Sequence, residues 1–138
     1  MAKIFKPSGL SDMRGASDTA KLTVSGVGLF TFNKKAISTL GLAPEDRLQV
    51  VQGEDPKDLF ICPIGKKGDG FQLASIKAGP NLVFCSAALR KQLIEVAYPD
   101  RKDLGKQTIT FLIGQESRME VEDKKNARVW PLLARAIV

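Results

Sequence analysis

The sequence predicts a mainly β domain with two short helices, in which one order of strands and a helix occurs twice. Three observations lead to this expectation. Short apolar runs alternate with polar residues at the spacing of half-buried strands, two segments with helical spacing follow good capping residues, and a glycine-rich stretch separates two similar halves. The 138 residues are enough for one domain with its own core.

The first half is predicted to hold four strands and one helix. Residues 1–20 combine Gly, Pro and Ser with little periodicity, and we expect them to form a flexible N-terminal arm. Asn33 is a good N-cap and Gly41 a good helix terminator. The first unit, residues 21–64, has expected strands at 21–25, 29–32, 47–52 and 58–64 and an expected helix at 34–40.

A Gly-rich linker, residues 65–70, is predicted to join the halves because three of its six residues are glycine. It lacks the glycine–lysine spacing of a phosphate-binding loop. In the second unit, residues 71–121, Ser86 is the expected N-cap. The expected elements are strands at 71–77, 82–85 and 107–114, a helix at 87–96 and a short strand at 118–121.

A shift of 53 residues aligns the two halves and suggests an internal duplication. It places residues 28–40 over residues 81–93, so that the capping residues Asn33 and Ser86 coincide and Leu40 coincides with Leu93. Few residues are identical, and chance agreement between two strand–helix–strand units is the alternative. Neither unit of about 45 residues would bury a sufficient core alone.

Residues 28–50 carry a recognisable pattern: Gly28, then Leu40-Gly41-Leu42, Asp46 and Leu48, with a short helix between. This resembles the AbrB/MazE-type swapped-hairpin (SpoVT-AbrB) family of DNA-binding regulators and antitoxins. The resemblance implies a β-barrel-like fold of duplicated ββαββ units, of swapped-hairpin or double-psi-like type. It also implies double-stranded DNA as the partner.

The chain departs from the family pattern at the positions that carry its function. The family's proline before the helix is Asn33 here, and Leu29, Ile37 and Ser38 stand where DNA-binding members often carry arginine. The inference of DNA binding therefore depends on other cations.

The net charge of +6, from 21 basic and 15 acidic residues, favours a polyanionic partner. If the loop after the second helix folds back beside that helix, its cations converge with those of the helix and contact several phosphates. The alternative is an ordinary solvated helix face. The candidate nucleic-acid-binding residues are Lys21, Lys34, Lys35, Lys77, Arg90, Lys91, Arg101, Lys102 and Lys106.

Residues 122–138 are predicted to form a C-terminal tail that is first charged and then apolar. Trp130, Leu132 and Leu133 are candidate partner-binding residues, because the resemblance implies a toxin-binding segment. The alternative is a tail docked on its own core or on a second chain of a homodimer, since an exposed apolar tail promotes aggregation.

No catalytic set or metal site is apparent. The chain has no His, which removes the commonest general base and the His-containing zinc sites. Cys62 and Cys85 lie in apolar runs and are expected to be buried free thiols, although a disulfide between them stays open. We therefore expect that the protein is not an enzyme and binds no cofactor.

The expected role is a DNA-binding transcriptional regulator or antitoxin-like module. The alternative is a protein–protein interaction or structural module. With no apolar run long enough to span a membrane, we expect a cytoplasmic protein.

Overall fold

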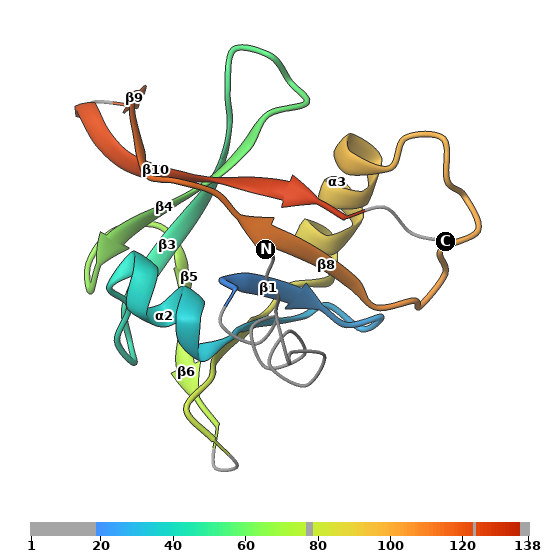
Figure 1. Cartoon of the computed structure of the whole chain (residues 1–138), viewed down its shortest axis with the longest axis horizontal. Helices are drawn as coiled ribbons and strands as arrows, with labels where there is room; N and C mark the ends of the chain where they lie inside the picture. The colour runs from blue at the N-terminus through green and yellow to red at the C-terminus, as the bar shows by residue number, and fades with distance from the viewer. Residues whose placement is uncertain (1–18, 77–78, 123, 136–138) are drawn as a thin grey trace, which may run out of the picture.

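The computed structural model describes residues 19–76, 79–122 and 124–135, which form a mainly β fold with two helices (Figure 1). The expectation of a mainly β, barrel-like domain with two helices is confirmed. The helices are α2 (Lys34–Leu40) and α3 (Ala87–Ala97). The strands are β1 (Lys21–Val24), β2 (Leu29–Phe32), β3 (Arg47–Gln52), β4 (Leu59–Gly65), β5 (Phe71–Gln72), β6 (Ala74–Ser75), β7 (Leu82–Cys85), β8 (Ile109–Ile113), β9 (Ser117–Val121) and β10 (Lys124–Ala134).

Nine of the strands follow one another in a single sheet, in the order β5-β3-β4-β10-β8-β1-β2-β7-β6, and β9 pairs with β10 outside this path. Every pairing is antiparallel. The two ends of the order, β5 and β6, are separated in the chain by Leu73 alone. The Leu73 N–H donates to the Asp46 carbonyl at 2.8 Å, and its carbonyl accepts from the Glu45 N–H at 2.9 Å. The sheet is thus a nearly closed barrel.

Aromatic side chains fill the barrel. The ring of Phe84 stacks on those of Phe30 and Phe71, with centroids 4.6 and 4.9 Å apart. Phe30, Phe32 and Phe111 are fully buried. These rings come from β2, β5, β7 and β8, so the core itself joins the two halves of the chain.

Both helices begin as the sequence predicts. The Asn33 side chain accepts from the Ala36 N–H at 2.9 Å, and the Ser86 hydroxyl accepts from the Leu89 N–H at 3.0 Å. Gly41 ends α2 in the left-handed conformation, with φ of 69°, which costs glycine little. Of the predicted strand at 71–77, the two short strands β5 and β6 form, interrupted where Leu73 bonds to the 45–46 turn.

The expected C-terminal tail contains an 11-residue strand, β10. Its second half pairs with β4 and β8 inside the barrel, and its first half forms a ribbon with β9 (Figure 1). The high charge of residues 122–128 concealed this strand, although the charged residues of this range that the structure describes, Glu122, Lys124, Lys125 and Arg128, are exposed on the ribbon. We call residues 117–122 and 124–129 the β9–β10 arm.

The apolar face of the arm packs on the outside of the barrel. Met119, Val121, Ala127 and Val129 form a second cluster with residues of β3 and β4, namely Val51, Phe60, Cys62 and Ile64. The arm is therefore held against the barrel by a small core of its own.

Replacing Phe84 by Ala should lower the free energy of unfolding by about 3–5 kcal/mol, because it removes both ring stacks and leaves a cavity. Urea unfolding followed by circular dichroism measures the change. Val27→Ala is the control, since Val27 is 72% exposed, and should change stability by less than about 0.5 kcal/mol. Equal effects of the two substitutions would contradict the position of Phe84 in the core.

Candidate nucleic-acid interface

Four of the predicted cations line one groove of about 350 Å³ between α3, the loop that follows it and the β1–β2 turn. They are Arg90 and Lys91 of α3 and Arg101 and Lys102 of the loop. Among the described residues, Glu95 is the one acidic residue in the lining, and Val27 also lines the groove. The loop thus folds back beside the helix, which is the condition under which these charges were expected to converge.

Two glycines allow the β1–β2 turn to reach this groove. A Cβ on Gly28 would lie 2.8 Å from the backbone of Ala87, and Gly28 has φ of 89°. Its carbonyl accepts from the Ser86 N–H at 2.8 Å. A Cβ on Gly26 would lie 1.9 Å from the carbonyl oxygen of Lys106. The turn therefore touches both the start of α3 and the end of the loop.

Arg90 is a buried positioning residue, so the alternative of an ordinary solvated helix face does not hold for this side chain. It is 9% exposed, and its Nη2 donates to the carbonyl of Gln107 at 2.8 Å. Its Nε has no hydrogen-bond partner among the described residues. The burial follows from the loop folding over α3, which the helical periodicity alone does not show.

Arg101 is paired within its own loop. Its Nε and Nη2 donate to the two carboxylate oxygens of Asp103 at 2.8 and 3.1 Å. This hydrogen bonding lowers the pKa of Asp103. Lys91 and Lys102 are exposed, and Lys106 is exposed at the end of the loop. The exposed positive charge of the groove is thus carried mainly by Lys91 and Lys102, with Lys106 at the end of the loop but outside the lining.

The remaining candidates lie elsewhere. Lys34 and Lys35 are exposed on α2 and do not line the groove. Lys21 is half-buried in β1, and its N–H donates to the Asn33 side chain at 3.1 Å. Lys77 lies outside the described residues.

The candidate partner-binding residues belong to β10. Trp130 is 3% and Leu132 7% exposed, and both lie in the barrel core, whereas Leu133 is 51% exposed. This arrangement corresponds to the alternative of a segment docked on its own core. Of these three residues, only Leu133 is exposed to a partner, because the pairing of β10 with β4 and β8 turns Trp130 and Leu132 inward.

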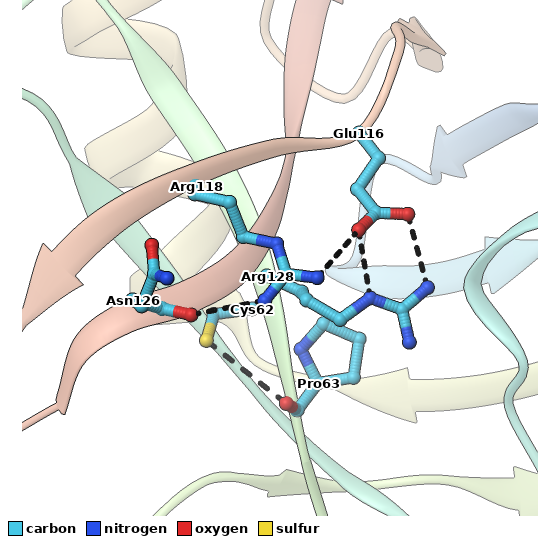
Figure 2. A network of polar contacts seen from close by, with 6 residues as sticks. All are labelled: Cys62, Pro63, Glu116, Arg118, Asn126 and Arg128. Atoms are coloured by element: carbon cyan, nitrogen blue, oxygen red, sulfur yellow. Dashed lines mark hydrogen bonds and ion pairs between the residues drawn. The ribbon is translucent and has the colours of Figure 1, made fainter.

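The arm carries four cations that the site prediction omitted: Arg118, Lys124, Lys125 and Arg128. Glu116 binds two of them (Figure 2), with a bidentate contact to Arg128 at 2.8 and 3.0 Å and a longer one to Arg118 at 3.6 Å. The Arg128 hydrogen bond lowers the pKa of Glu116. The alternation of Met119 and Val121 with charged residues was the available signal for this ribbon.

Both cysteines are free, so the open alternative of a Cys62–Cys85 disulfide is not realised. Cys62 is buried as expected, but Cys85 is exposed, because the end of β7 turns its side chain outward. The described residues contain no group of three potential metal ligands and no helix that is long and apolar enough to cross a membrane.

Comparison of the chain with protein-family models, curated proteins and solved structures finds no match.

Replacing Arg90 by Met should loosen the loop over α3, because the apolar stem is kept while the bond to the Gln107 carbonyl is lost. Amide exchange across residues 98–107, measured by mass spectrometry, should become about tenfold faster or more. Lys91→Met removes an exposed charge from the same helix and is the matched control. Unchanged exchange in the Arg90 variant would show that this bond does not hold the loop.

The two thiols should differ strongly in reactivity toward an aromatic disulfide reagent at pH 8. Burial raises the pKa of Cys62, so less of the reactive thiolate is present there, and the β9–β10 arm that packs against Cys62 limits access. Cys85 should react in a fast phase and Cys62 only as the structure opens. Cys85→Ser should remove the fast phase, and a fast phase that persists in this variant would contradict the burial of Cys62.

Proposed function

We propose that this protein binds double-stranded DNA through the groove beside α3, as a transcriptional regulator or antitoxin-like module. The observation that carries the proposal is the convergence of the exposed Lys91 and Lys102 on one groove, with Lys106 exposed at the end of the same loop. Arg90 positions this loop, and Arg101 is paired with Asp103. Lysine and arginine side chains gathered on one face neutralise backbone phosphates and fix the position of a protein on a duplex.

The arrangement fits a duplex better than a single strand. No aromatic ring of the described residues lines the groove, whereas single-strand binding surfaces stack successive bases on such rings. Tyr98, the residue that directly follows α3, is part-buried, and its hydroxyl donates to the Arg135 carbonyl at 2.5 Å. Lysine side chains that contact the phosphates of the DNA backbone suit binding to a duplex.

The finer fold proposal is a duplicated pair of ββαββ units of swapped-hairpin or double-psi-like type. Its support lies in the register between β2 and β7. Leu29 faces Cys85, the residue 53 positions after Phe32, and Phe32 faces Leu82, the residue 53 positions after Leu29. Two related strands that pair antiparallel in this way are arranged about a local two-fold axis.

This proposed relationship also bears on DNA binding. The family resemblance implies arginine in mid-helix, where α2 has Ile37 and Ser38. The residues 53 positions later are Arg90 and Lys91 of α3. On this view, the second unit keeps the basic mid-helix positions that the first unit has lost, which favours the α3 side as the DNA-binding face.

Fluorescence anisotropy with a random-sequence duplex across a salt series tests this proposal. We expect micromolar affinity whose logarithm falls linearly with the logarithm of salt concentration, with a slope of about −3 if about three phosphates are neutralised. The variant Lys91→Glu/Lys102→Glu should lower affinity by about 100-fold at low salt, since it reverses two exposed charges of the groove.

The matched control is Lys34→Glu/Lys35→Glu on α2, which changes the net charge equally outside the groove. It should lower affinity by less than about threefold. Equal losses in the two variants would assign binding to net charge alone. No binding by the unaltered protein at low salt would overturn the proposal.

A further inference from the structure

The β9–β10 arm has one edge that no described strand covers. β9 pairs with β10 along one side and with no other strand in the described ranges. An uncovered edge exposes a row of backbone N–H and C=O groups that can bind another extended strand.

The side chains of β9 alternate between two faces of the arm. Met119 and Val121 lie on the face that packs against the barrel. Arg118 and Glu120 lie on the opposite face, and both are exposed. Figure 2 shows Arg118 extended along this outer face toward Glu116 and the carbonyl of Asn126.

We propose that β9 pairs with β9 of a second copy of this chain, antiparallel, about a two-fold axis at Met119. In this register Arg118 of each copy lies directly opposite Glu120 of the other. Opposite charges facing each other across two strands stabilise the pair. The two-fold axis makes the contact occur twice and closes the assembly as a dimer.

The charges select a single register. A slip of two residues in one direction places Arg118 opposite Arg118, and a slip in the other direction places Glu120 opposite Glu120. A slip of one residue places Arg118 opposite Met119, so that charged side chains of one copy face apolar side chains of the other. The register centred on Met119 avoids all three conflicts.

The same pattern argues for a second copy rather than an unrelated strand. An edge protected by charge repels its own copy when its charges have one sign. Here Arg118 and Glu120 have opposite signs and are two residues apart, so β9 is complementary to itself. The strand is five residues long, and so short an interface gives weak association that appears at high protein concentration.

Sedimentation velocity of the full chain over a range of concentrations, without DNA, tests this inference apart from the proposed function. The unaltered protein should form dimers as concentration rises. Arg118→Glu and Glu120→Arg should each weaken dimerisation about tenfold or more, since each places two like-charged pairs across the axis. Lys125→Glu is the control: it equals the first variant in charge change, lies on the other strand of the arm and should leave dimerisation unchanged.

Two combinations distinguish pairing from a general effect of charge. An equal mixture of the Arg118→Glu and Glu120→Arg proteins should form heterodimers, because each charge then meets its opposite. The double variant Arg118→Glu/Glu120→Arg should dimerise like the unaltered protein. A monomer at all concentrations overturns the inference, and so does dimerisation that survives both single reversals or is not restored in the mixture.

Cross-linking checks the register directly. Opposed residues of antiparallel strands have Cβ atoms about 4.5–5.5 Å apart, close to the separation in a disulfide. In a Cys85→Ser background, Met119→Cys should give a covalent dimer when diamide takes two electrons and two protons from the paired thiols. Lys125→Cys should give none under the same conditions, and equal yields would overturn the register.

Discussion

The short segment from Phe71 to Ser75 determines whether the sheet is a barrel or an open surface. Phe71 pairs with Leu48 of β3, and the two residues that follow Leu73 pair with β7. An open sheet of this size would leave two edges with unpaired backbone groups. By running from one edge to the other, this segment pairs with part of each edge, two residues of β3 and two of β7, and contributes Phe71 to the stacked rings of Phe30, Phe71 and Phe84.

The groove beside α3 depends indirectly on the closure of the barrel. α3 starts at the end of β7, so closing the barrel fixes where the helix begins and which face it turns to the loop. Gly28 then brings the β1–β2 turn against Ala87, and Arg90 holds the loop through the carbonyl of Gln107. The lysines are exposed on a surface whose shape is set by buried contacts.

Sequence patterns predicted the features that depend on neighbouring residues. Asn33, Gly41 and Ser86 act within one helical turn, so their roles follow from residue type and spacing. Arg101 and Lys102 line the same groove as Lys91 because only a short chain separates them from α3, and their role in binding stays a prediction.

Features set by residues far apart in the chain were not predicted. Arg90 is polar and stands on an apparently exposed face, yet the loop buries it. β10 contains Pro131 and begins with charged residues, both unusual for a strand inside a sheet, and only its pairing with β4 and β8 makes it one. Cys85 lies in an apolar run, but its position at the end of β7 exposes it.

The strand order has a consequence for how the chain acquires its structure as it is synthesised. β1 pairs with β8, β2 with β7, β3 with β5 and β4 with β10, so each strand of the first half has a partner from the second half. When residues 1–65 have left the ribosome, most of their sheet edges are still without partners. Contacts between residues so distant in sequence form slowly, and strand edges that are still unpaired promote aggregation until these contacts form. Folding of this barrel therefore depends on its last strand, and a chain truncated before β10 is a substrate for chaperones and proteases rather than a smaller folded domain.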